Sequence, residues 1–427
     1  MKKIVFSILF CLPFIVTAGG FQLNLQGIKA IGMGGAFTGI ASDASTVFFN
    51  PGGMSNFNGK HNFILGFNVI DPYVSLQTNV TSNIDQTTGK ATPFHFYYVG
   101  ELNEKIRFGF LVNNQFGSSS SFEDDWQGRF IVQNISLKSF MFQPTLSYKL
   151  HEKITIGAGF VYTMGTFSYE KGVPVGSATI KEGKASLSGS GDGMSYNFGI
   201  FSNLFTLERD LATTDFSLGV NYRSGIRVDL PEGEALFTDI PISLQDKFPA
   251  STNFTGTLNL PSVFTIGMSV KHKRANYSLE FAYDLNYTTW SSYDTLVFDF
   301  ENEDTPDTKE TKNWQNTTTH RFGLDFTYKE KYSARIGISI DQTPILDGYL
   351  SPELPGMDQV AYAGGLGYKV NDKFSVDFSF IHLDGERESG LDDAGFSAKY
   401  RRAANVYSLG LSIKLGGKKK EEASSIN

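Results

Sequence analysis

Apolar and polar residues alternate strictly over long stretches of this chain. Between residues 277 and 287 every odd position is Tyr, Leu or Phe, and the even positions are Ser, Glu, Ala, Asp and Asn. The same period of two recurs at residues 154–164, 319–328, 334–340, 376–380 and 407–415. Because successive side chains of a strand point to opposite faces of its sheet, this period predicts β-strands with one apolar face. The expected fold class is all-β.

The composition indicates that the apolar face meets lipid. The chain has 427 residues with 38 Phe, 19 Tyr and 44 Gly, yet only 41% of it is hydrophobic. After residue 16 no apolar run approaches the roughly 20 residues of a transmembrane helix, which excludes a helical membrane protein. An aromatic, Gly-rich and half-polar chain is typical of a transmembrane β-barrel, whose outer face is apolar and whose lumen is polar.

Connections of unequal length support a barrel. Short polar turns are expected at residues 271–276, 329–331 and 369–373, and long polar insertions at 171–192, 299–318 and 384–402. Short turns at one end and long loops at the other are the outer-membrane pattern. A soluble β-sandwich also alternates, but the long strands, the aromatic face and the unequal loops count against it. We predict a transmembrane barrel of about fourteen antiparallel strands.

An apolar leader opens the chain. Lys2 and Lys3 precede the apolar residues 4–16, and small residues suited to cleavage follow. This pattern predicts a signal peptide over residues 1–18. The single cysteine, Cys11, lies within this leader, so we expect neither a disulfide nor a cysteine-based metal site in the mature chain.

The segment directly after the leader lacks the alternation. It is apolar and rich in glycine, including Gly34, Gly35 and Gly52, which suits backbone packed in a crowded space. Asn50-Pro51 favours an extended residue followed by a fixed φ, as at a helix boundary. A short non-strand module before a long β-domain predicts a hatch that plugs the lumen. The expected organisation is a signal peptide at 1–18, a hatch at 19–58, a transmembrane barrel at 59–415 and a polar tail at 416–427.

Short motifs are spread over the whole expected mature chain. They are GGFQLN at 19–24, GGAF at 34–37, ASDAS at 41–45, NPGG at 50–53, DP at 71–72, GVNYRS at 219–224, LP at 260–261, WSSY at 290–293, TP at 343–344, LPGMD at 354–358 and NDKFS at 371–375. In this combination and order they resemble the FadL family of outer-membrane long-chain fatty acid and hydrocarbon transporters.

The resemblance implies a fourteen-stranded barrel with a hatch in its lumen. It also implies a route in which a hydrophobic molecule is captured outside, passes to a lumenal pocket and leaves sideways through the wall. An aromatic residue at the position of Phe21 lines the pocket in the family, so Phe21 is the first candidate for contact with a ligand. Hatch and gating roles fall to Gly34, Gly35, Asn50, Pro51 and Gly52.

Arginines on lumen-facing strand positions form a second group of candidates: Arg107, Arg223, Arg321 and Arg335. Most lumenal charges are expected to pair with carboxylates such as Asp325 and Asp377, since unpaired buried charge is costly. An anionic headgroup, in contrast, needs an unpaired cation at the end of an apolar pocket. We expect Arg223 to be that exception, because it lies in the GVNYRS motif.

These observations together predict a passive outer-membrane transporter of hydrophobic small molecules in a Gram-negative bacterium. Its expected partners are the substrate and outer-membrane lipids, and it is expected to be a monomer. A general porin, or an adhesin-type barrel without a hydrophobic substrate, stays open as the alternative, although a porin needs an open lumen.

Other functions find no support in the residues. None of the six histidines lies in a Gly-x-Ser-x-Gly or His-Glu-x-x-His setting, so no catalytic residues are expected. The acidic residues 299–310 lack the fixed ligand spacing of a calcium loop, and we expect neither a metal nor a cofactor. A formal net charge of -7 argues against nucleic acid as a partner.

Overall fold

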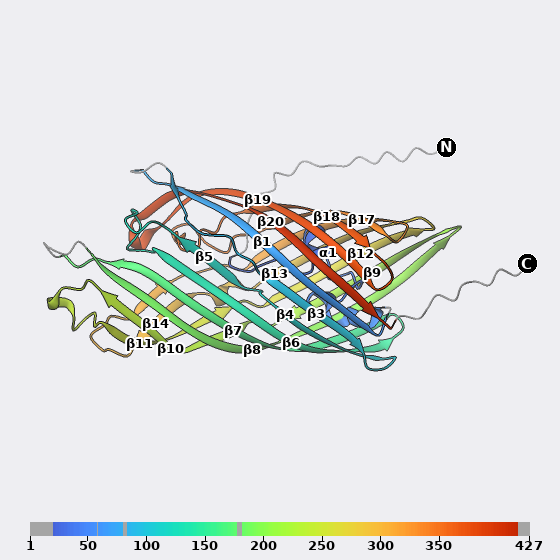
Figure 1. Cartoon of the computed structure of the whole chain (residues 1–427), viewed down its shortest axis with the longest axis horizontal. Helices are drawn as coiled ribbons and strands as arrows, with labels where there is room; N and C mark the ends of the chain where they lie inside the picture. Colours follow the sequence, from blue (N-terminus) through green and yellow to red (C-terminus); the bar gives the residue numbers. More distant parts are fainter. Residues whose placement is uncertain (1–19, 58, 80–82, 177–181, 417–427) are drawn as a thin grey trace, which may run out of the picture.

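A computed structural model describes residues 20–57, 59–79, 83–176 and 182–416, which form a closed antiparallel β-barrel (Figure 1). The predicted signal peptide at 1–18, and all but the first residue of the predicted tail, lie outside the described residues. None of the helices in the described part of the chain is long and apolar enough to cross a membrane.

Fourteen of the described strands form the ring, as the alternation predicts. Each pairs with the next along the chain of ring strands, and β1 closes the ring by pairing with β20 from His61↔Leu415 to Gln77↔Lys399. The ring strands are β1 (His61–Gln77), β3 (Phe94–Glu101), β4 (Ile106–Asn113), β6 (Asn134–His151), β7 (Ile154–Val173), β8 (Gly183–Arg209), β9 (Ala212–Arg223), β12 (Val263–Arg274), β13 (Tyr277–Thr288), β16 (Thr317–Tyr328), β17 (Tyr332–Asp341), β18 (Gln359–Lys369), β19 (Phe374–Leu391) and β20 (Phe396–Leu415).

The remaining strands extend the wall at one end. The sheet grows from β8 through β10, β11 and β14 to β15, at the end of the barrel opposite the short turns (Figure 1). These elements are β2 (Ile84–Asp85), β5 (Gly117–Ser121), β10 (Ile226–Thr238), β11 (Ser251–Leu260), β14 (Thr295–Phe300) and β15 (Thr308–Thr311), with the 3₁₀ turns η2 (Ile242–Leu244), η3 (Trp290–Ser292) and η4 (Asp392–Ala394).

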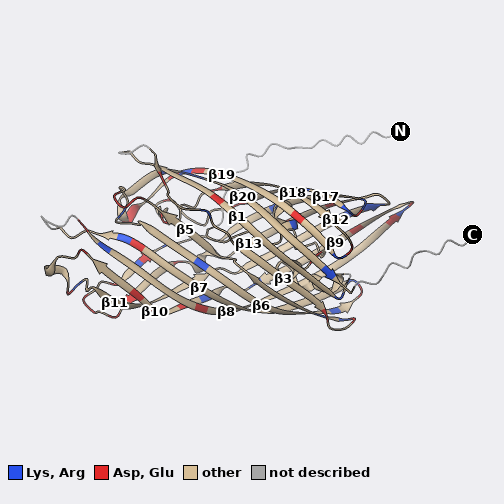
Figure 2. Ribbon diagram, in the orientation of Figure 1, with Lys and Arg blue, Asp and Glu red and all other residues tan. Residues whose placement is uncertain are grey.

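The apolar face of the ring strands points outward. On β13, Leu279 and Phe281 are exposed, whereas Glu280 and Asp284 are buried in the lumen. Long stretches of the strands carry no charged residue (Figure 2). An apolar exterior with a polar interior is the arrangement that a lipid bilayer requires, and it is the reverse of a soluble sandwich.

The prediction of long loops is wrong for two of the three polar insertions, which are largely strand. Residues 171–192 contain the end of β7 and the start of β8, and residues 384–402 are mostly a hairpin of β19 and β20. Polar residues pair across this hairpin, as in the ion pair of 3.0 Å between Lys399 and Glu386. Strand that projects beyond the membrane meets water on its outer face, so the apolar alternation that marks a membrane strand disappears there.

Residues 20–57 lie inside the ring as short helices and irregular backbone. α1 contacts β17 to β20, and η1 contacts β4 and β6 to β9 on other parts of the wall. Close backbone contact is possible because glycine has no side chain, as at Gly34 (φ 65°), where a Cβ would lie 2.8 Å from the Ile338 amide nitrogen. The helices of this segment are α1 (Ile28–Gly32), α2 (Thr46–Phe49) and η1 (Pro51–Asn56).

Candidate functional site

Phe21 lies in a cluster of aromatic rings near the start of the described chain. Its ring centroid is 5.1 Å from Trp290, 5.4 Å from Tyr293 and 5.8 Å from Trp314, mostly in edge-on geometry. Phe116 packs on another side at 6.0 Å. The Phe21 side chain is only 4% exposed. Rings at these separations attract one another through their quadrupoles, so the cluster fixes the position of Phe21.

Backbone pairing with an interrupted part of the wall also holds Phe21 in place. The ladder of β4 with β6 ends at Asn113↔Met141, and the ladder of β5 with β6 begins only at Gly117↔Lys138. Across this break the Leu23 amide donates to Gln115 O (2.7 Å) and the Gly117 amide donates to Phe21 O (3.1 Å). The N-terminal segment therefore supplies hydrogen bonds where the barrel strand stops.

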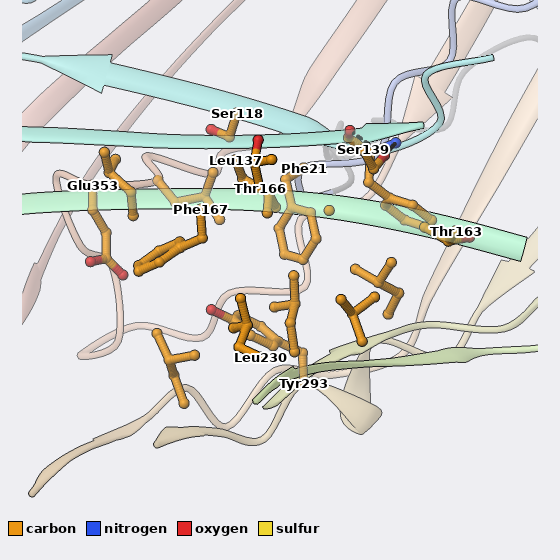
Figure 3. Close-up of a pocket in the computed structure, with 18 of the residues that line it drawn as sticks. Phe21, Ser118, Leu137, Ser139, Thr163, Thr166, Phe167, Leu230, Tyr293 and Glu353 are labelled. Atoms are coloured by element: carbon orange, nitrogen blue, oxygen red, sulfur yellow. Dashed lines mark hydrogen bonds between the residues drawn. The ribbon is translucent and has the colours of Figure 1, made fainter. Parts of the chain in front are cut away.

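The Phe21 ring forms part of the wall of an apolar cavity of about 70 Å³. Figure 3 shows Phe21 in the middle of the lining side chains and Glu353 at their edge. Most of the lining is aliphatic or aromatic, with a few hydroxyl groups from Ser and Thr. Besides Phe21, it comes from the strands β5, β6, β7, β10, β11 and β14 and from three loops, and it includes Phe116, Ile135, Leu137, Phe167, Val228, Leu230, Leu258, Tyr293, Leu296 and Phe298.

A buried ion cluster borders the cavity. Lys312 is 7% exposed, and its ammonium group is 2.7 Å from Glu310 and in close contact with Glu353, which is 6% exposed. Burial alone would lower the pKa of Lys312, but the two carboxylates outweigh it and raise that pKa well above the usual range. Burial raises the pKa of Glu353, and Lys312 only partly offsets this effect.

A second cavity, of about 140 Å³, lies on the other side of the N-terminal segment. Gly34 and Gly35 line it together with residues of β17 to β20 and Ile70 of β1. Asp341 and Arg402 contribute polar atoms to its wall. The two predicted hatch glycines thus border open space on one side and the barrel wall on the other.

The predicted Asn-Pro-Gly turn anchors the opposite part of the hatch. The Asn50 side-chain amide donates to Ile200 O (2.9 Å) and to Thr38 O (3.1 Å), and its oxygen accepts from the Gly52 amide (3.1 Å). The Thr155 hydroxyl donates to Gly52 O at 2.5 Å. Pro51 packs on glycines of β7 and β8, where a Cβ would clash with it.

Arg223 does not line the apolar cavity. Its guanidinium donates to Gln143 Oε1 (2.8 Å) and to Phe48 O (3.2 Å), and it stacks on the Phe48 ring at 4.6 Å. The structure therefore places Arg223 beneath α2, in contact with the hatch. A role in binding a headgroup stays a prediction for this residue.

Two of the other three predicted lumenal arginines pair with carboxylates, and the third, Arg321, donates to Asn24 Oδ1 (2.8 Å). Arg335 donates to Asp325 (2.6 Å) and to Asp377 (2.7 Å). Arg107 contacts Glu101 at 3.2 Å. Among the described residues, no group of His, Cys, Asp or Glu is arranged to hold a metal ion.

Sequence reasoning missed the side chains that surround Phe21 on the loop side. Trp290 and Tyr293 lie within the WSSY motif, and two of the chain's three tryptophans stand in this one cluster, which was a usable signal. Lys312 and Glu353 are 41 residues apart in loops without any periodic pattern, and no local signal joins them.

Comparison with known proteins shows which family has this architecture. The family described as outer membrane protein transport protein (OMPP1/FadL/TodX) matches residues 9–414. The long-chain fatty acid transport protein of Salmonella typhi is 24% identical, over 86% of this chain and 88% of the relative. Outer membrane protein P1 of Haemophilus influenzae is also 24% identical, over 91% of both chains.

Solved structures show the same fold. A FadL homologue of Pseudomonas aeruginosa superposes with a TM-score of 0.76 at 17% identity, over 92% of this chain and 99% of that one. The toluene transporter TodX of P. putida superposes with a TM-score of 0.68 at 15% identity, over 91% of this chain and 98% of that one.

Proposed function

The chain belongs to the OMPP1/FadL/TodX family of outer membrane transport proteins, and on that premise we propose that it carries hydrophobic small molecules passively through its lumen and out sideways. It is an outer-membrane β-barrel of a transport family, not an enzyme. We propose that it acts as a monomer, since one ring contains its own hatch and cavity. The relatives include proteins named for long-chain fatty acids and for toluene, so both classes are candidate cargo.

The apolar cavity closed by Phe21 is the observation that carries this proposal. Its described lining is almost entirely apolar and encloses open space, whereas the barrel buries polar strand residues such as Asn221, Thr265 and Asp284 elsewhere. Ligand sites are typically lined by hydrophobic and aromatic groups with a few placed polar atoms. A hydrophobic guest is the occupant that such a lining favours.

The hatch is the proposed gate. The open volume of about 70 Å³ is far below the roughly 300 Å³ of a typical ligand site, so the lining has to move when a ligand binds. Phe21 is the lining residue that belongs to the predicted hatch, and the backbone of residues 21–23 is held by two hydrogen bonds to the wall. The turn at Asn50 to Gly52 is bonded more extensively and would stay fixed.

The break between β4 and β5 is the proposed lateral exit. Residues 114–116 leave the ladder there, and β3 pairs with β1 only as far as Phe67↔Phe94. A molecule that leaves through this part of the wall enters lipid without crossing water, where apolar surface is unfavourable. Displacement of residues 21–23 from the break would couple ligand binding to exit.

Uptake by whole cells tests the proposal. A Gram-negative host that lacks its own channel for hydrophobic compounds is transformed with the full chain or with a variant lacking residues 20–57. We expect accumulation of labelled toluene or oleate with the full chain, and a return to the empty-vector level with the deletion. Uptake that survives removal of the hatch would contradict hatch gating, and a full chain that takes up neither compound would contradict the transport proposal.

A further inference from the structure

The geometry points to an uncharged cargo: we propose that the Phe21 cavity selects neutral hydrophobic molecules over carboxylates of the same chain length, because Glu353 occupies its polar end. This inference rests on the proposed transport function and names the substrate class within it. It assigns Glu353 as a residue that determines specificity.

The charge on the cavity wall is the first observation. Among the described lining residues Glu353 is the only one with a charged side chain, and it is a carboxylate. Every other lining residue is aliphatic, aromatic, glycine or a hydroxyl-bearing side chain. Glu353 stands at the edge of the lining group, beside Phe167 (Figure 3). An anionic headgroup at this end would lie against a buried like charge.

The nearest cation is already neutralised. Lys312 is held between Glu353 and Glu310, with 2.7 Å to the second carboxylate. Two carboxylates around one ammonium leave the cluster with a net negative charge when all three groups are ionised. A substrate carboxylate would become the third around Lys312, in a site too buried for water to screen the repulsion.

The arginine expected to receive a headgroup is engaged elsewhere. Arg223 contacts Gln143 and the backbone of the hatch, and it is absent from the cavity wall. A hydroxyl or a hydrocarbon end adds no charge, and a hydroxyl can bond to the serine and threonine oxygens of the wall.

Ligands matched in length test the inference with the complete protein in amphipol at pH 8, where decanoate is ionised. Binding of 1-decanol and of decanoate is followed by fluorescence of Trp290 and Trp314, which stand beside Phe21. We expect decanol to bind about tenfold or more tighter than decanoate, since like charges opposed in a buried site are strongly disfavoured. In Glu353→Gln the ratio of the two affinities should fall about tenfold, because Lys312 stays paired with Glu310 and the cluster loses its excess negative charge.

The matched control is Glu388→Gln, an equal change of charge at an exposed position of β19 outside this cavity. It should leave the affinity ratio unchanged. The inference is overturned if wild-type protein binds decanoate as tightly as decanol, which needs no variant to fold, or if Glu353→Gln leaves the ratio as it was. If wild-type protein binds neither ligand, the transport proposal itself fails, and this result is distinct from loss of selectivity.

Discussion

The side chain of Phe21 joins two parts of the molecule that are far apart in sequence. It belongs to the N-terminal segment, yet its ring packs on Trp290, Tyr293 and Trp314. Aromatic pairs contribute about 0.5–1.5 kcal/mol each beyond the area they bury. The closed form of the cavity therefore depends on loop residues as much as on the hatch.

Truncation of this ring tests its place in the cavity. We expect Phe21→Ala to weaken binding of a hydrophobic ligand about tenfold, because it removes aromatic contact and the support that positions residues 21–23. The barrel should stay folded, since its ladder does not involve this residue. Fluorescence titration measures the affinity, and Phe281→Ala on the lipid face is the control. An unchanged affinity would remove Phe21 from the list of ligand contacts.

Lys312 is a second residue that joins parts of the chain far apart in sequence, because it pairs with Glu310 and Glu353. We expect Lys312→Met to loosen residues 342–358 by about 3–5 kcal/mol, because it leaves the buried carboxylate of Glu353 and the half-buried one of Glu310 without this cation. Hydrogen exchange of that loop measures the loss. The double variant Lys312→Met with Glu353→Leu should recover much of the protection, and a double variant as unstable as the single one would speak against the ion cluster.

The ion cluster also predicts a dependence on pH. Burial alone would raise the pKa of Glu310, but Lys312 outweighs it and lowers that pKa below the usual 4.5. A carboxyl group whose pKa is lower in the folded than in the unfolded state stabilises the fold when the pH is above its unfolded-state pKa. This contribution is lost as the pH falls through the folded-state pKa. Lys312 has a raised pKa, so its ion pairs contribute fully to stability below pH 10.5. This contribution is lost only as the pH rises through the raised pKa of Lys312.

The variant Glu310→Gln tests the loss of stability at acid pH that the ionisation of Glu310 predicts. At pH 7 we expect faster hydrogen exchange in residues 342–358 than in the wild type, because the ionised partner of Lys312 is gone. The two proteins should converge as the pH falls well below 4.5, where Glu310 is protonated and resembles Gln. A difference that persists in acid would assign the effect to packing instead of charge.

At the scale of elements, alternation predicts a strand only where lipid meets one of its faces. β13 and β16 follow the pattern throughout, and their predicted bounds agree closely with the structure. The projecting ends of β7, β8, β19 and β20 do not follow it, because water lies outside and polar side chains suffice. The aromatic cluster and the Lys312 site could not be read in the same way, since they form between loops whose contacts are nonlocal.

The break between β4 and β5 is the element that links cavity and wall. Gln22 and Phe116 are partners in an antiparallel bridge across it. Paired residues of antiparallel strands have Cα atoms about 4.5–5.5 Å apart, which suits a disulfide. The only native cysteine, Cys11, lies in the predicted signal peptide, so an introduced pair has no competing partner in the mature chain.

We expect Gln22→Cys with Phe116→Cys to lock residues 21–23 onto the wall and to stop uptake when oxidised. Reduction with dithiothreitol should restore uptake in the same sample, which controls for the loss of the Phe116 ring. The variant Gln22→Cys alone should not respond to oxidation or reduction. Equal uptake in the oxidised and reduced double variant would exclude movement at this break as a required step.

At the scale of the whole molecule, residues 20–57 make close backbone contacts with the barrel wall. Inward glycines of the strands meet hatch backbone directly, as where a Cβ on Gly337 would lie 2.1 Å from the Gly34 amide nitrogen. Asp284, buried on β13, accepts hydrogen bonds from the amides of Phe37 (3.0 Å) and Thr38 (2.9 Å). Where these contacts occur they leave little room for ions and water, and the open space beside Gly34 and Gly35 is about 140 Å³.

Conductance in planar bilayers therefore distinguishes the transporter from the porin alternative. The full chain should show little steady current, because residues 20–57 fill the lumen. The variant lacking these residues should conduct steadily, since the polar inner face of the strands would then line an open passage. A shift of electrophoretic mobility on heating verifies that both proteins form barrels. A full chain that conducts as the deletion does would favour a porin, and a silent deletion would mean that the extracellular strands and loops, and not the hatch, close the barrel.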